Sequence, residues 1–496
     1  MAASILTSGS RAANALYSLA RPQIKIDLAG EKDNLINNYI TGDRIEGTVT
    51  VTAAHLTSFD ELEIQLEGSQ TVSVERGAVP GRTGATQTFL RLRQPIEDDL
   101  YPMPRVIEPG RTYRFPFTFV VPQHLLPHIC SHFKSNAHIQ DSHTLLLPSM
   151  GEPMLASDGK SVLDDMSPDM TRVTYHIRAE VLQKPVVGSA KSLRATRKKI
   201  RIVPAVEEQP PLTVLDNDPV YRVRKEKDVR RGTLRPRQGR LVAAASQPKP
   251  LQLSPPNAQA PSESVNTAAT VHLRFDPVDD EEPPSLGTVW SKLRVATYYT
   301  VHPWDDYPTA SVVSALDMSG RGVYQDTVPL SSMCVASAQW TKQTGDIVRR
   351  DSLQSTSSAE SITGPSASFS GETYYTASLT VPVSLPKSRA FLPTFHSCLI
   401  SRIYILELCI SYHTPNMNIF TPTISLKLPV QLTLGPAGGT SRRSSEEITQ
   451  EDVDAQFFSP RSVAPPELDS VAPPDYSEYR ALPSPLTRRP QEIRCS

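Results

Sequence analysis

Short runs in which apolar and polar residues alternate recur along the amino-terminal part of the chain. Residues Gln23–Leu28 read QIKIDL, so Ile24, Ile26 and Leu28 share one face. A repeat of two is the period of a β-strand with one buried face. The same pattern recurs at Ile45–Val51, Leu62–Leu66, Phe115–Phe119 and Val173–Val181. Because turn residues rather than helical repeats separate these runs, the pattern predicts an antiparallel β-sandwich over residues 21–205.

A second set of alternating runs lies in the carboxyl-terminal part. It comprises Val271–Phe275, Leu406–Tyr412 and Ile424–Leu434. These runs predict a second sandwich over residues 269–435, and a serine-rich stretch, residues 351–372, predicts a disordered loop within it. The expected fold class is therefore all-β, with two antiparallel immunoglobulin-like β-sandwiches and little helix.

Three further segments lack strand alternation. Residues 206–268 are basic and proline-rich, with nine basic and two acidic residues between Tyr221 and Arg240; they predict a linker that cannot bury enough apolar surface to pack. Residues 436–496 predict a disordered tail. Residues 1–20 predict a short helix or a frayed leader, although the lack of acidic residues beside Arg11 also fits a mitochondrial presequence.

Composition narrows the class of function. The 496 residues include 51 Lys and Arg against 52 Asp and Glu, so net charge gives no reason to expect nucleic acid as a partner. The five cysteines form no CxxC pair, which favours a reducing compartment with buried thiols. Apolar runs stay below the roughly 20 residues that a membrane-spanning helix needs.

The sequence shows no convincing catalytic motif. SDGKS, at Ser157–Ser161, ends like a phosphate-binding loop, but Met154 stands where the first glycine belongs, and no helical repeat follows. HExxH and GxSxG are both absent from the sequence. We therefore expect a protein that is not an enzyme and that has no cofactor.

A histidine-rich stretch is the densest polar cluster. His124, His128 and His132 recur every four residues, a spacing that would place zinc ligands on one face of a helix. Pro127 interrupts such a helix, so a loop with mostly solvated histidines and no metal is the preferred interpretation. A zinc hydrolase built on the three histidines is the alternative. Other polar residues in the same stretch are Cys130, His138, Asp141 and His143.

The basic run and the serines suggest sites of regulation or contact. The candidate contacts for an acidic partner or anionic lipid are Arg222, Arg224, Lys225, Arg230 and Arg231, with solvated charge as the alternative. Nucleic acid is disfavoured because the run lacks interleaved aromatic residues. Ser352, Ser444 and Ser445 each follow paired arginines, so all three are candidate phosphorylation sites.

The tail carries a short motif with a physical rationale. In SVAPPDYSEYR, Pro473 and Pro474 favour a polyproline II backbone, and Tyr476 adds an aromatic anchor. The aromatic-lined grooves of WW domains accept this shape. APPEL, ending at Leu468, has the same two prolines but lacks the tyrosine. The sequence therefore predicts one complete Pro-Pro-x-Tyr motif for a WW domain.

Longer stretches resemble a known family. YITGDRIEGTVTV (Tyr39–Val51), LEGSQT (Leu66–Thr71), YRFPFTFVVPQHLLP (Tyr113–Pro127) and SHTLLLPSMG (Ser142–Gly151) resemble the arrestin amino-terminal domain of fungal arrestin-related trafficking adaptors. Residues Ser384–Tyr412 resemble the late strands of an arrestin carboxyl-terminal domain. The resemblance covers residues 21–435.

The resemblance implies two antiparallel sandwiches and a specific cellular role. Members of that family recruit HECT-type ubiquitin ligases through WW domains and present plasma-membrane transporters for ubiquitination and endocytosis. The resemblance thus implies a cytoplasmic protein that is recruited to the plasma membrane and endosomes. The expected partners are the ligase and the cytosolic tails of transporters. The alternative is a retromer-like sorting scaffold that acts without a ligase.

Overall fold

The described part of the chain covers most of residues 21–435. The computed structural model describes residues 21–31, 36–75, 81–155, 162–184, 189–215, 218–230, 237–255, 265–278, 281–309, 320–344, 364–413 and 421–435. The predicted leader (1–20), the predicted tail (436–496) and residues 351–363 of the serine-rich stretch lie outside these ranges.

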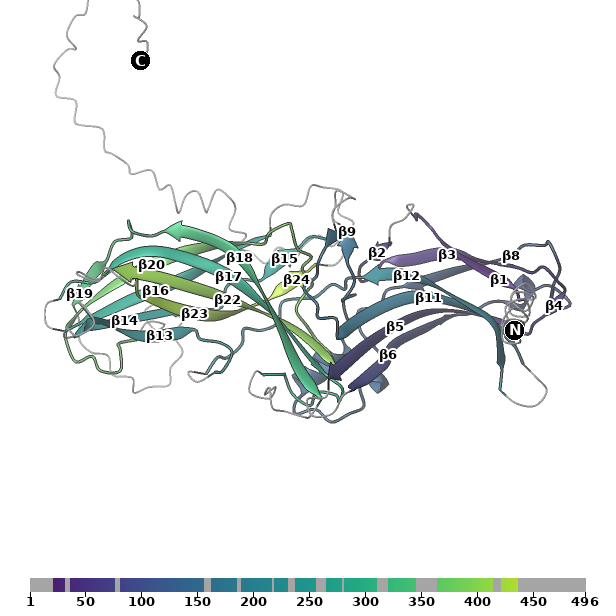
Figure 1. Ribbon diagram of the computed structural model, residues 1–496, viewed down its shortest axis with the longest axis horizontal. Coiled ribbons are helices and arrows are strands. Elements are labelled where there is room, and N and C mark those ends of the chain that lie inside the picture. The colour runs from purple at the N-terminus through teal and green to yellow at the C-terminus, as the bar shows by residue number, and fades with distance from the viewer. Residues whose placement is uncertain are drawn as a thin grey trace, which may run out of the picture. The chain divides into compact units, whose positions relative to one another are not determined.

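The described chain is almost entirely strand (Figure 1). The amino-terminal strand group consists of β1 (Gln23–Leu28), β2 (Asn38–Tyr39), β3 (Arg44–Thr52), β4 (Thr57–Ser58), β5 (Glu61–Glu75), β6 (Arg82–Gln94), β7 (Val106–Ile107), β8 (Tyr113–Val120), β9 (Met154–Leu155), β10 (Val162–Leu163), β11 (Thr171–Gln183) and β12 (Lys191–Ile202). Its helical elements are two 3-10 helices, Asp98–Leu100 and Pro127–Ile129, and the α-helix α2 (Ala137–Thr144).

The carboxyl-terminal strand group has the same character. It consists of β13 (Arg224–Arg230), β14 (Arg237–Ala245), β15 (Leu251–Leu253), β16 (Asn266–Pro277), β17 (Ser285–Thr300), β18 (Arg321–Cys334), β19 (Thr341–Thr344), β20 (Thr373–Ser384), β21 (Phe395–His396), β22 (Ile400–His413), β23 (Thr423–Val430) and β24 (Leu432–Leu434). The expected all-β class is confirmed.

Two main sheets build the amino-terminal strand group, beside the two-stranded pairs β4-β7 and β9-β10. Strands β1, β3 and β8 form one in that order, and β2, β12, β11, β5 and β6 form the other, with antiparallel pairing except between β2 and β12. Alternate residues of both sheets enter a first hydrophobic cluster; Ile45 and Val49 of β3 are fully buried there, together with Ile64 and Leu66 of β5. The period of two in the sequence thus corresponds to the buried faces of real strands.

Two larger sheets build the carboxyl-terminal strand group. One runs β13-β14-β16-β20-β19; the other runs β18-β17-β22-β21, with β23 also paired to β22. A second hydrophobic cluster takes side chains from both sheets, including Phe275 of β16 and Leu406 of β22. The long alternating run Ile424–Leu434 is divided at Gln431 into β23 and β24, and β24 pairs with β15 in parallel.

The prediction of an unpacked linker over residues 206–268 is wrong for much of that segment. Strands β13 and β14 pair with each other, and β14 also pairs with β16. Leu241 and the residues that follow it in β14 are buried. The charges are accommodated across strands, because Arg240 lies 3.1 Å from both Glu226 and Asp228. Composition averaged over the segment therefore concealed a strand pair whose charges neutralise one another.

The first hydrophobic cluster is not confined to the amino-terminal strand group. It also contains Tyr299, at the end of β17, and several residues around the start of β22: Leu392, Phe395, Cys398, Leu399 and Ile400. The loop before β22 therefore packs among side chains from β5, β6 and the segment that follows β8. This packing brings chemically reactive residues from distant parts of the sequence together.

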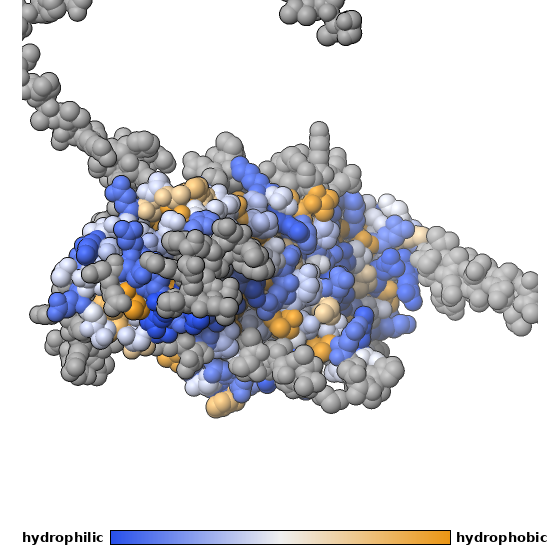
Figure 2. Space-filling model, turned by 60° about the vertical axis from the view of Figure 1, so that its left-hand side comes forward, coloured by the Kyte–Doolittle hydropathy of each residue, from blue (hydrophilic) through white to orange (hydrophobic). Residues whose placement is uncertain are grey.

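The distribution of hydrophobic residues on the described surface does not single out a binding site. On the face drawn in Figure 2, hydrophilic residues predominate and hydrophobic ones are scattered in small groups. Within the described ranges, no helix is both long enough and apolar enough to cross a membrane.

Candidate metal centre

Cys130 is held at the end of a short 3-10 helix. Pro127 occupies the first turn of this helix, where its missing N–H costs nothing, and the backbone N–H of Cys130 closes the turn on the Pro127 carbonyl. Leu125, just before the helix, is buried in the first hydrophobic cluster. Cys130 itself is 2% exposed. Its thiol is therefore fixed inside the protein rather than presented to solvent.

His143 comes from the short helix α2. Asn136 caps this helix, because its side-chain oxygen accepts a hydrogen bond of 3.1 Å from the Ile139 backbone N–H. Ile139 and His143 are four residues apart and therefore share one face, which is the buried one. His143 is only 3% exposed. The interpretation of this stretch as mostly solvated histidines is wrong for His143.

Cys398 belongs to the carboxyl-terminal strand group and lies in the turn between β21 and β22. Its backbone carbonyl accepts a hydrogen bond of 2.9 Å from the Trp304 N–H. The preceding Ser397 fixes the turn, since its Oγ accepts from the Ile400 N–H at 3.0 Å. Ser397 Oγ also lies 2.9 Å from Oε1 of Gln70, on β5. Cys398 is 3% exposed, so its sulfur is fixed by contacts from both strand groups.

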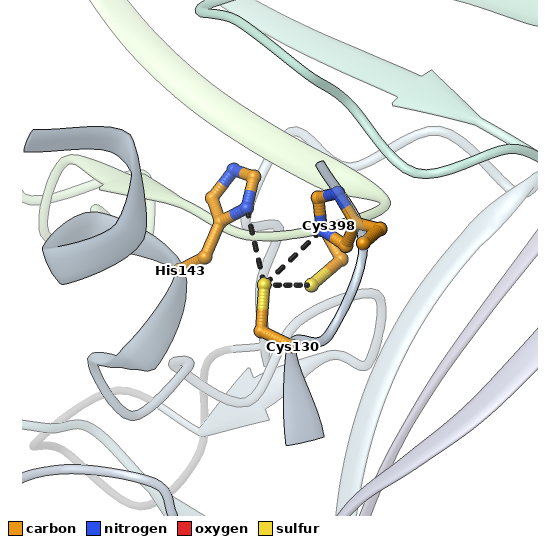
Figure 3. Close-up of side chains that lie close together, drawn as sticks. Cys130, His143 and Cys398 are labelled. Atoms are coloured by element: carbon orange, nitrogen blue, oxygen red, sulfur yellow. Dashed lines mark hydrogen bonds between the residues drawn. The ribbon is translucent and has the colours of Figure 1, made fainter. Parts of the chain in front are cut away.

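Four potential ligand atoms converge at this point. The Cys130 and Cys398 sulfurs are 3.3 Å apart, and Cys130 Sγ lies 3.1 Å from Nε2 of His132 and 3.6 Å from Nδ1 of His143. All four atoms lie within 4.8 Å of one another. Figure 3 shows the side chains of Cys130, His143 and Cys398 pointing toward a common centre.

The surroundings of the cluster orient its donors. His132 Nδ1 lies 2.9 Å from the Phe133 carbonyl oxygen, which can only accept, so Nδ1 donates there and Nε2 is the nitrogen that faces Cys130. The Lys134 ammonium donates to the Cys130 carbonyl. The hydrogen bond donated by the Cys398 thiol lowers the pKa of Cys130, with help from the two nearby histidines and against the effect of burial. The same bond, together with burial, raises the pKa of Cys398.

The four donor atoms are of the types that bind zinc. Two sulfurs and two imidazole nitrogens are soft and borderline ligands of the kind that zinc prefers. All four come from protein side chains, three of them buried. A closed set of this kind suits a structural metal better than a catalytic one, which keeps a position open for water or substrate.

The structure separates the three histidines that are spaced by four residues. His124 is exposed in a bridge opposite Leu145, and His128 is exposed on the 3-10 helix. Only His132 joins the cluster. His138 and Asp141 lie on the exposed face of α2. Pro127 explains the difference from a regular helix, because it begins a 3-10 turn instead of continuing an α-helix.

Sequence reasoning missed Cys398 as a partner of this stretch. It lies 268 residues from Cys130, so no short spacing motif links the two. The remaining cysteines behave differently: Cys409 is half-buried, while Cys334 is exposed, contrary to the expectation of buried thiols. The four described cysteines are all free thiols.

Three of the predicted basic contacts, Arg224, Lys225 and Arg230, lie on the ordered strand β13 instead of a flexible linker. Arg224 forms an ion pair of 2.6 Å with Glu226 and donates to the carbonyls of Gly364 and Pro365. Lys225 is half-buried, whereas Arg222 and Arg230 are exposed. Arg231 lies outside the described residues, as do Ser352, Ser444, Ser445, Pro473, Pro474 and Tyr476.

Comparison with known proteins supplies no family assignment. Neither the scan against protein-family models nor the search of curated proteins found a match to this chain.

Proposed function

We propose that the protein is an adaptor that recruits a WW-domain ubiquitin ligase of the HECT type to membrane transporters and so promotes their ubiquitination and endocytosis. The observation that carries the proposal is the tail motif, in which Pro473 and Pro474 precede Tyr476. A polyproline II segment loses little conformational entropy on binding, and the tyrosine fills an aromatic pocket. No catalytic step is assigned to the chain.

The fold class gives this proposal additional support, although the tail motif carries it. Two hydrophobic clusters, each supplied by a pair of antiparallel sheets, suit a finer assignment as two arrestin-like β-sandwiches over residues 21–205 and about 224–435. The change from residue 269 to about 224 as the start of the second sandwich follows from β13 and β14. In this proposal the rigid sheets present cargo while the tail binds the ligase.

Cargo contact is assigned to two exposed arginines, Arg222 just before β13 and Arg230 at its end. Arg222 and Arg230 are exposed and therefore available to an acidic transporter tail or to an anionic membrane surface. Arg224 is engaged within the protein and is removed from this role. The adaptor would act in the cytoplasm and reach the plasma membrane and endosomes through these partners.

The test is a binding measurement on the full chain. Wild-type protein should bind isolated WW domains with a dissociation constant on the order of micromolar, or about 8 kcal/mol, as expected for one short motif. Tyr476→Ala should abolish this binding because it removes the aromatic anchor. Restoring a tyrosine elsewhere provides the control: Leu468→Tyr in the Tyr476→Ala background completes a second Pro-Pro-x-Tyr motif and should restore binding.

The cellular counterpart uses the same three proteins. Transporter turnover should be lost in Tyr476→Ala and regained in the double variant. Equal binding by the wild type and Tyr476→Ala, or unchanged turnover, would contradict the adaptor function. A sorting scaffold that acts without a ligase would then be the better account.

A further inference from the structure

We propose that Cys130, His132, His143 and Cys398 form a structural zinc site that fastens the loop preceding β22 to the segment following β8. The inference is independent of the adaptor function, because it rests on a buried donor set and not on the tail. Three donors lie between residues 130 and 143, and the fourth comes from the carboxyl-terminal strand group.

The distances fit a tetrahedral ion. Zinc bonds of about 2.3 Å to sulfur and 2.0–2.1 Å to nitrogen require tetrahedron edges of roughly 3.3–3.8 Å. The separations from Cys130 Sγ to the other three donors are 3.1, 3.3 and 3.6 Å. These three separations lie within about 0.5 Å of the tetrahedral edges. The remaining separations among the four donors do not exceed 4.8 Å.

The hydrogen bond that His132 makes away from the sulfur matches what a zinc-bound histidine requires. A ligating imidazole usually donates its other N–H to a carbonyl or carboxylate, which fixes the tautomer and the ring orientation. His132 does so already, with Nδ1 2.9 Å from the Phe133 carbonyl oxygen, and its Nε2 faces the sulfur. This arrangement selects the nitrogen that a metal would use.

The backbone around the sulfurs is also fixed on both sides. Gln87 Nε2 donates to the Ile129 carbonyl at 3.1 Å, next to Cys130, and Gln87 Oε1 accepts from Gln70 Nε2 at 2.7 Å. Gln70 in turn contacts Ser397, next to Cys398. A chain of buried and part-buried hydrogen bonds thus links the residues that precede the two cysteines. The site is therefore held in place before any metal arrives.

A bound metal would stabilise these four side chains more than the hydrogen bonds among them do. Thiols are weak donors and weak acceptors, so two buried sulfurs and a buried imidazole gain little from one another in the absence of a stronger partner. Zinc would replace the thiol protons: both sulfurs bind as thiolates, and the protons released pass to solvent. No oxidant is required, which distinguishes this step from disulfide formation.

The proposed site would join two cysteines that are far apart in the sequence. Because Cys398 lies 268 residues after Cys130, a metal shared by the two closes a very long loop. Binding to the folded state alone stabilises that state in proportion to the logarithm of the free metal concentration. We expect the zinc site to stabilise the packing of the β21–β22 turn against the first hydrophobic cluster.

The primary test measures metal in the full-length protein. Protein purified under reducing conditions, without chelator, should carry about one zinc per chain by elemental analysis and native mass spectrometry. Cys130→Ser and Cys398→Ser should each reduce this to near zero. Cys334→Ser is the matched control, because its thiol is exposed and does not belong to the cluster, and it should keep full occupancy.

A second measurement uses the wild-type protein, so it remains informative if the cysteine variants fail to fold. Cobalt added to metal-free wild-type protein should give the intense visible bands of a tetrahedral site and the sulfur-to-cobalt charge-transfer band. His143→Gln should weaken these bands, whereas His124→Gln should leave them unchanged, since His124 is exposed and outside the cluster. Zinc added afterwards should displace the cobalt and abolish the bands.

Two results would overturn the proposal. One is wild-type protein without zinc that also gives no tetrahedral cobalt spectrum. The other is a Cys130–Cys398 disulfide, mapped by mass spectrometry in protein kept reduced throughout purification. Loss of the zinc site would leave the tail binding of Tyr476 untouched, so failure of this inference is distinguishable from failure of the proposed function.

Discussion

The side chain of Arg402, on β22, donates a hydrogen bond of 3.1 Å to the carbonyl oxygen of Met166, 236 residues earlier in the chain. Met166 has φ of 57°, an unusual left-handed conformation for a residue with a side chain. Arg402 is fully buried and also donates to the Asp165 carbonyl and the Thr297 hydroxyl. The guanidinium group therefore holds a strained turn in place from the opposite strand group.

Arg402→Met should destabilise the protein strongly. The substitution leaves the carbonyls of Asp165 and Met166 buried without their donor, and each unsatisfied group costs about 1–3 kcal/mol. We expect a loss of about 2–6 kcal/mol in the free energy of unfolding, measured by urea denaturation of the full chain. Arg389→Met is the control: Arg389 reaches the same turn through an exposed ion pair with Asp164, at 2.6 Å, and should cost no more than about 1 kcal/mol. Equal losses in the two variants would contradict the role assigned to Arg402.

Gly239→Ala should be poorly tolerated although it adds one methyl group. A Cβ at this position in β14 would collide with the ring of Phe275 and lie 2.7 Å from the Asp276 carbonyl oxygen. Overpacking of this kind costs typically about 1–3 kcal/mol. Gly84→Ala, in β6, is the matched control, because its nearest neighbour is the Val72 carbonyl oxygen at 3.4 Å. Thermal unfolding should show a clear decrease in Tm for the first variant and little change for the second; if both variants melt like the wild type, β14 does not pack as described.

His176 should make the protein less stable in mild acid. Burial lowers its pKa below the ordinary 6.5 and outweighs the hydrogen bond of 2.8 Å to Glu67. The charged groups around it are Glu67 on β5, Arg91 on β6, Arg178 on β11 and Arg197 on β12. The unfolded chain therefore binds a proton at a higher pH than the folded chain does. Stability should fall as the pH falls through about 6.5, by no more than about 1.4 kcal/mol per pH unit.

His176→Gln isolates this contribution. Glutamine keeps a polar group near Glu67 but does not titrate, so the variant should lose less stability than the wild type between about pH 7.5 and pH 5.5. Urea denaturation at both pH values measures the difference. Parallel losses in the two proteins would show that other groups cause the acid sensitivity.

The cysteines should differ in their reactivity toward a maleimide in the native protein. Cys334 is exposed, at the end of β18, whereas Cys130 and Cys398 are 2% and 3% exposed. We expect rapid labelling at Cys334, with the two buried thiols labelled only after unfolding. Peptide mapping by mass spectrometry locates the modified residues, and Cys334→Ser confirms the assignment. Early modification of Cys398 would show that the turn before β22 opens readily.

The alternation of apolar and polar residues was enough to predict strands that bury one apolar face, such as β11. In β11, Val173, Tyr175 and Ile177 alternate with polar residues and are all buried, as the period of two indicates. The basic strand β13 was missed because its stability comes from a partner: Arg240 neutralises Glu226 and Asp228 only when β14 lies alongside. Such cross-strand pairing is not visible in the composition of either segment.

The candidate metal centre marks a second limit of local reasoning. The stretch around Cys130 was interpreted as a loop without metal, and of the three histidines in the zinc alternative only His132 belongs to the observed cluster. Pro127 turns the chain so that His124 and His128 face solvent, and the fold places Cys398 beside Cys130. A donor contributed by a turn between two later strands can be found only once the strands are placed.

Strand β22 has a consequence for how the protein melts. Ile400, at its start, belongs to the first hydrophobic cluster, while Leu406, Leu408 and Ile410 belong to the second. One continuous strand therefore contributes to both cores, and neither core can come apart without disturbing the strand that the other needs. We expect the two strand groups to unfold together as one cooperative unit, visible as a single heat-capacity peak where two independent domains would give two.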